Sequence, residues 1–282
     1  MLHIKHIRKI KSLSCCLPIL LASNFFGSAI SSATEINSIN ESNIITTTGY
    51  DPISYPNNKQ WAMYQGNPAH SGYIPLVLDA NNFHEIWTKD PGLGNLHPSI
   101  AVAGKVITTP NESGLAIWGI SALDLRTGRN IWHTPLIANT NIYAGSPASN
   151  NNGKLYVHTS HGWDKASQLW SIDEQTGTIE STSRWPLGSG YTLFRAPTIY
   201  DNKIYLRGNY GCVTALDTLA ENPLWESGPI CRRVGEDNEP AVDENHVYIG
   251  GDEQNLLFLD RQTGEIVSSI PDASVGTPTL TE

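Results

Sequence analysis

Short runs of alternating apolar and polar residues, separated by turn residues, follow one another through most of this chain. The clearest set covers residues 99–102, 106–109, 119–123 and 130–133. Alternation with a period of two is typical of half-buried β-strands. Four such runs joined by short turns predict a four-stranded antiparallel meander, so the fold class is predicted to be all-β.

The meander recurs along the chain. Equivalent aspartates stand at Asp124, Asp173, Asp217 and Asp260, with spacings of 49, 44 and 43 residues. Four-stranded repeats of this length are typical of propeller blades. We therefore predict a β-propeller within residues 59–282, with complete blades around 98–132, 147–181, 197–225 and 240–268 and a fifth begun at 278.

A turn motif of the form Asp-x-x-Thr-Gly separates the third and fourth strands of the first repeat. Here Asp124 can accept bonds from the following backbone N–H groups, and Gly128 can adopt a positive φ. Trp132 follows four residues later and offers a flat face to the neighbouring blade. The later repeats depart from this motif, with Leu219-Ala220 in place of Thr-Gly and serines in place of the tryptophan at Ser181 and Ser268.

The motif formed by Asp124, Thr127, Gly128 and Trp132 resembles the tryptophan-docking repeat of the pyrroloquinoline-quinone (PQQ) enzyme-like β-propellers. Residues 61–72 also resemble the opening segment common in that superfamily. The resemblance covers about residues 61–282 and implies either a quinoprotein dehydrogenase or a non-catalytic scaffold, since the fold alone does not decide function. Members usually have about seven or eight blades, so three outcomes are open: a truncated gene product, two half-rings that associate, or a small propeller.

The N-terminal residues are typical of a secretory signal peptide. Four basic residues precede an apolar stretch at 13–26, and small residues follow it, which predicts a signal peptide at 1–33. Residues 34–58 are polar and predict a flexible lead-in. The mature protein is thus expected in the periplasm or outside a bacterial cell, without a membrane span.

Charge narrows the range of partners. The whole chain carries a formal charge of −9, and removal of the basic leader makes the mature chain more acidic. Because nucleic-acid binding depends on basic surfaces, nucleic acid is excluded as a partner. A protein partner is expected, and self-association of half-propellers remains open.

Two sets of polar residues are candidates for a binding face. The first set comprises Arg195, Arg207, Arg232, Arg233, Glu236, Asp237 and Glu239. The resemblance implies that the arginines could pair with the carboxylates of PQQ and that the acidic residues could hold calcium. The alternative is salt bridging within a solvated loop. The second set, His158, His161 and Asp164, is a weak candidate for a divalent metal against an exposed polar loop.

Cys212 and Cys231 are the two cysteines left after the signal peptide is removed, and they predict a disulfide in an oxidising compartment. Two free thiols are the alternative.

The chain has no Cys-x-x-Cys-His haem motif. We therefore expect an exported, non-catalytic binding or scaffold module with no catalytic residues. The alternative is a PQQ- and calcium-dependent dehydrogenase, or a remnant of one.

Overall fold

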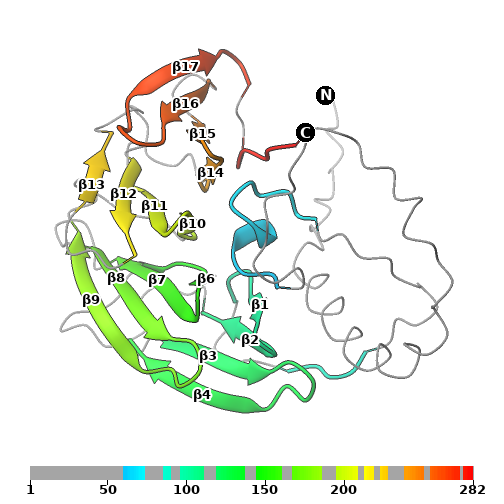
Figure 1. The fold of residues 1–282 in the computed structure, drawn as a ribbon. Coiled ribbons are helices and arrows are strands. Elements are labelled where there is room, and N and C mark those ends of the chain that lie inside the picture. Colours follow the sequence, from blue (N-terminus) through cyan, green and yellow to red (C-terminus); the bar gives the residue numbers. More distant parts are fainter. Residues whose placement is uncertain are drawn as a thin grey trace, which may run out of the picture.

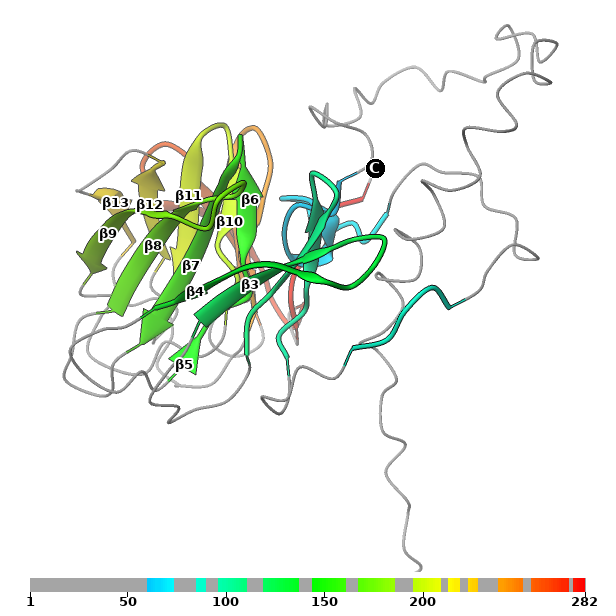
Figure 2. The same ribbon diagram turned by 90° about the horizontal axis from the view of Figure 1, so that it is seen from below.

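The computed structural model describes residues 60–73, 85–89, 96–110, 119–136, 144–160, 167–185, 195–208, 213–218, 223–227, 238–250, 255–273 and 276–281. Within them, four antiparallel sheets lie side by side in an arc (Figure 1), and the perpendicular view shows the sheets stacked face to face (Figure 2). The all-β propeller architecture predicted from the repeats is confirmed. Among these residues, no helix has the length and hydropathy needed to cross a membrane.

Each sheet is a meander in which successive strands pair. Blade 1 comprises β1 (Ile100–Val102), β2 (Lys105–Thr108), β3 (Gly119–Asp124) and β4 (Asn130–Pro135). These bounds agree within two residues with the strands expected from the alternation. Blade 3 comprises β10 (Thr198–Tyr200), β11 (Lys203–Arg207), β12 (Val213–Asp217) and β13 (Pro223–Glu226).

The other two blades follow the same plan. Blade 4 comprises β14 (Ala241–Val242), β15 (His246–Gly250), β16 (Leu256–Asp260) and β17 (Ile266–Ile270). Blade 2 comprises β7 (Lys154–Ser160), β8 (Ser167–Asp173) and β9 (Ile179–Trp185), and its inner edge is divided between β5 (Ala144–Gly145) and β6 (Ser149–Asn151). Pro147 lies between β5 and β6, where it has no N–H to give to a ladder.

The register shifts at the same place in all four blades. The shift follows Ala122, Ser171, Ala215 and Phe258, each on the third strand. Such a bulge adds local twist to the outer strand. The repeat is therefore conserved within the chain down to this irregularity.

The apolar core lies between the blades. One cluster, including Ile107, Ala122 and Trp170, fills the space between blades 1 and 2. A second, including Tyr156, Ile204 and Leu216, joins blade 2 to blade 3. A third joins blades 3 and 4 around residues such as Tyr205, Val247 and Leu259. A meander alone could not bury both of its faces, so stacking provides the core.

The inner edge of the arc is lined by residues 60–73, which we call the axial segment. It contains the short 3₁₀-helix η2 (Tyr64–Gly66) and lies beside the innermost strands (Figure 1). Trp61 forms an antiparallel bridge with Ala101 of β1. The first residues of the repeat region are thus tied to blade 1.

Candidate functional site

The Asp-x-x-Thr-Gly turns form as the sequence predicted. Asp124 Oδ1 accepts hydrogen bonds from Thr127 Oγ1 at 2.7 Å, from Thr127 N at 2.8 Å and from Arg126 N at 3.1 Å. The Thr127 hydroxyl is the largest cause of a lowered Asp124 pKa, because these donors favour the carboxylate. Equivalent bonds to Asp173 and Asp260 organise the turns of blades 2 and 4.

A tryptophan of one blade docks on the turn of the next. Trp132 Nε1 donates to Glu174 O at 3.2 Å, and Trp225 Nε1 donates to Arg261 O at 3.0 Å. Trp87, which precedes blade 1, donates to Leu125 O at 3.0 Å. In each case the acceptor is the carbonyl of the residue that directly follows the turn aspartate.

The turn glycine is required for this contact as well as for the turn. Gly177 has a φ of +74°, and a Cβ there would lie 2.6 Å from the Trp132 ring. Gly128 has a φ of +66°, and a Cβ there would lie 2.7 Å from Trp87. A larger residue would therefore strain the backbone and displace the indole.

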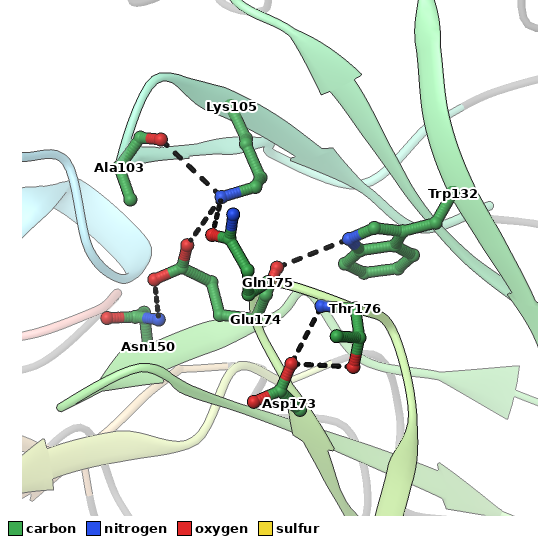
Figure 3. Close-up of polar contacts among 8 residues, drawn as sticks. All are labelled: Ala103, Lys105, Trp132, Asn150, Asp173, Glu174, Gln175 and Thr176. Carbon is green, nitrogen blue, oxygen red and sulfur yellow. Dashed lines mark hydrogen bonds and ion pairs between the residues drawn. The ribbon is translucent and has the colours of Figure 1, made fainter.

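A buried polar network adjoins the tryptophan between blades 1 and 2 (Figure 3). Lys105 Nζ lies 2.9 Å from both Glu174 Oε1 and Gln175 Oε1, and Asn150 Nδ2 donates to Glu174 Oε2 at 3.3 Å. The side chains of Lys105 and Glu174 are 6% and 9% exposed. A buried ion pair of this kind needs these extra hydrogen bonds to offset its desolvation.

The junction between blades 2 and 3 is built differently. Ser181 stands at the tryptophan position of blade 2, and counting from Asp217 places Ala220 and Glu221, rather than Leu219-Ala220, at the Thr and Gly positions of blade 3. The carbonyl that follows Asp217 is nevertheless bonded, because Tyr156 Oη donates to Thr218 O at 3.2 Å. A tyrosine on the second strand thus supplies the donor that an outer-strand indole supplies elsewhere.

Arg195 and Arg207, two of the predicted binding-face residues, are buried. They are 8% and 3% exposed. Arg195 Nη1 donates to Gly208 O at 3.1 Å, while Arg207 Nη2 donates to Gly250 O of blade 4. These guanidinium groups hold main-chain carbonyls within and between blades 3 and 4. We therefore expect their removal to lower the unfolding midpoint.

Glu239, the third described member of that set, is 8% exposed and accepts a hydrogen bond from Thr277 Oγ1 at 3.0 Å. Burial raises the Glu239 pKa, because desolvation disfavours the carboxylate. The structure thus brings Glu239 together with the C-terminal segment (residues 276–281).

The remaining predicted residues divide into two groups. His158 lies in β7 rather than in a loop and is 4% exposed. The others lie outside the described residues, so the disulfide remains a prediction: Arg232, Arg233, Glu236, Asp237, His161, Asp164, Cys212 and Cys231. In the part of the chain that the structure describes, no group of three His, Cys, Asp or Glu residues is placed to hold a metal ion.

Sequence reasoning missed His70 and the Lys105 network. His70 is 1% exposed, and burial lowers its pKa to about 4. A signal for the network was present, since Lys105, Lys154 and Lys203 recur at one repeat position. Lys203 Nζ indeed donates to Gln262 Oε1 at 3.1 Å, a contact between blades 3 and 4.

These repeated, docked meanders define a β-propeller repeat protein. The chain belongs to the PQQ_2 family, described as outer membrane protein assembly factor BamB, whose model matches residues 119–279. Its sequence is 27% identical over 180 residues to the BamB protein of Shewanella oneidensis, covering 61% of this chain and 39% of that protein. It therefore spans well under half of this curated relative.

Solved structures show the same fold at low identity. Quinohemoprotein alcohol dehydrogenase ADHIIG from Pseudomonas putida HK5 matches with a TM-score of 0.57 and 18% identity, covering 76% of this chain and 40% of that one. The corresponding enzyme from Comamonas testosteroni matches with a TM-score of 0.57 and 13% identity, covering 75% of this chain and 49% of that one. At this identity the likeness concerns the fold alone.

Proposed function

We propose that this chain is an exported, non-catalytic protein-binding scaffold that acts in outer-membrane protein assembly. The observation that carries the proposal is the match of residues 119–279 to the BamB model. The signal-peptide pattern at residues 1–33 supports export to the periplasmic side. A propeller serves this role by holding its loops on a rigid frame, where binding residues are commonly found.

The burial of the arginines also supports a scaffold over a quinoprotein. Three carboxylates of PQQ would need guanidinium groups that a ligand can reach. Arg195 and Arg207 instead direct Nη atoms at main-chain carbonyls, and both are less than a tenth exposed.

A binding measurement tests the scaffold. The chain starting at Thr34 is immobilised and exposed to a purified outer-membrane assembly complex that lacks its own BamB subunit. We expect saturable binding, which excess free chain should reduce. A heat-unfolded sample of the chain serves as the control, and equal capture by both samples would contradict the proposal.

A thermal melt distinguishes the scaffold from the alternative, a PQQ- and calcium-dependent dehydrogenase. Ligand at 100 times its dissociation constant adds about 2.7 kcal/mol of stability, which raises the melting temperature of a domain of this size by several degrees. We expect no shift with PQQ and calcium together. A rise that requires both ligands would favour the dehydrogenase.

A further inference from the structure

The axial segment makes main-chain contacts with the innermost strands of three blades and with the C-terminal segment. Trp61 N donates to Ala101 O of blade 1 at 2.9 Å, Asn150 N of blade 2 donates to Ala62 O at 2.7 Å, and Val242 N of blade 4 donates to Pro68 O at 2.8 Å. Leu280 N donates to Ala69 O at 2.8 Å. These bonds satisfy backbone groups at the inner edges of the sheets, which would otherwise lack partners there.

Blade 3 is contacted through a side chain. His70 Nδ1 lies 3.2 Å from Pro278 O, and its Nε2 lies 3.4 Å from Thr198 Oγ1. The carbonyl can only accept, so Nδ1 carries the proton, and Nε2 of the neutral ring accepts from the Thr198 hydroxyl. One side chain thus joins the axial segment to blade 3 and to the C-terminal segment.

Apolar anchors accompany these bonds. Met63 is 7% exposed and packs in the cluster between blades 2 and 3, and Ala69 is 2% exposed. Trp61 packs against the cluster between blades 1 and 2. Tyr73, at the end of the segment, is 66% exposed. Binding is therefore concentrated in residues 61–70.

Hydrogen bonds also form within the axial segment. Gly66 N donates to Met63 O, His70 N donates to Asn67 O, and Gly72 N donates to Gln65 O. Asn67 Oδ1 accepts from Ser71 N at 3.1 Å. A peptide with internal turns loses less conformational freedom when it binds.

We propose that the inner edges of the four blades form a receptor for a short peptide with internal turns, and that residues 60–73 are its covalently attached ligand, exchangeable with the same segment of a second copy. The recognised features are a leading tryptophan, a methionine two residues later and a buried histidine. The receptor lies at the centre of the arc (Figure 1). This inference does not rest on the proposed scaffold function.

The test uses the full chain and a fluorescent synthetic peptide of residues 60–73. In the native chain the attached segment competes at a high effective concentration, which blocks the added peptide. The substitution Met63→Lys in the chain places a charge among apolar side chains and weakens the attached segment. We expect the peptide to bind this variant at least about tenfold more tightly than the native chain, and to raise the melting temperature of the variant only.

Two controls make the result specific. A chain with Tyr73→Lys should behave as the native chain, because Tyr73 is exposed. A peptide carrying Met63→Lys should not bind. Equal binding to the native and variant chains, or none to either, would overturn the proposal.

A milder substitution guards against a variant that does not fold. Met63→Ala removes the anchor without adding a charge, and the same rescue by peptide is expected. If neither variant melts cooperatively with the peptide present, residues 60–73 are an integral part of one folding unit and the proposal is wrong.

Discussion

At two junctions between blades, the backbone carbonyl that directly follows the turn aspartate accepts a side-chain hydrogen bond, but the donors differ. One junction joins blades 1 and 2, and the other joins blades 2 and 3. At the first, Trp132 bonds Glu174 O, and at the second, Tyr156 bonds Thr218 O. The sheet register explains the exchange. Ala122 pairs with Trp132 on the outer strand of blade 1, whereas Ser171 lies between Tyr156 and Ser181 in blade 2. Ser181 thus stands at the register position that Trp132 occupies in blade 1.

The comparison shows which part of the repeat is constrained. A buried carbonyl without a donor is costly, so each junction needs a donor at that point. The tryptophan is one source of the donor, and each described turn that receives a tryptophan has a glycine, Gly128, Gly177 or Gly264. The junction between blades 2 and 3 lacks both residues in the sequence, because Ser181 and Glu221 stand at their positions.

The largest expected effect comes from the buried lysine at the first junction. Lys105→Ala leaves Glu174 buried without its ion-pair partner, and we expect a loss of about 3 kcal/mol in the free energy of unfolding. Lys154→Ala is the matched control, because Lys154 holds the same repeat position but pairs with Glu180 at the surface, with side chains 39% and 35% exposed. That variant should lose less than about 1 kcal/mol. Urea unfolding measures both, and equal losses would contradict the difference between the junctions.

The turn glycine that receives Trp132 comes next. Gly177→Ala and Gly153→Ala both place a Cβ at a positive φ, +74° and +81°, but only the first meets an indole, since nothing lies within 4 Å at Gly153. The shared backbone strain costs about 1 kcal/mol. We expect Gly177→Ala to cost about 2 kcal/mol more than Gly153→Ala in chemical unfolding. Similar costs for the two would show that the indole moves freely.

Acid should also weaken the first junction. His97 has a backbone hydrogen bond with Gly145 of blade 2, and burial lowers its pKa to about 4 from the usual 6.5. Between pH 6.5 and 4 the unfolded chain therefore binds a proton that the folded chain does not, so stability falls as the pH falls. Lowering the pH from 7 to 5 should cost about 2 kcal/mol through this histidine.

His97→Gln isolates that contribution. The variant should lose about 2 kcal/mol of the pH dependence between pH 7 and 5, while the part due to His70 remains. Urea unfolding at both pH values measures the difference. An unchanged dependence in the variant would mean that His97 does not titrate as its burial implies.

Most of the fold could be predicted from the sequence, because local rules act at each repeat. Alternation located the strands of blade 1 within two residues, and the turn aspartates bond as the motif implied. These features depend on residues close together in the chain. The axial segment was recognised only as an opening motif, since its contacts join Pro68 to Val242 and His70 to Pro278 across most of the chain.

The candidate site was harder to predict, because the sequence shows a charge but not its burial. Arg195 and Arg207 were expected on a binding face, and the structure places them against carbonyls. Lys105 bonds Glu174 and Gln175 of the next blade, whereas Lys154 pairs with Glu180 of its own blade. That difference depends on which turns become neighbours in space.

The smallest expected effect comes from removing the Tyr156 hydroxyl, which is the donor at the junction between blades 2 and 3. Tyr156→Phe removes one hydrogen bond to Thr218 O and keeps the ring, so we expect a loss of about 1 kcal/mol in the free energy of unfolding. Amide hydrogen exchange should quicken in β7 and β12, which meet at this junction, and stay unchanged in β2 and β3. Trp132→Phe should instead quicken exchange in β4 and β8, whose ends meet at the first junction, and leave β12 unchanged. Because the two donors belong to different junctions, their costs should add in the double variant. Unchanged exchange in β12 after Tyr156→Phe would show that the Thr218 carbonyl does not depend on the tyrosine, and that the two junctions do not share a common requirement.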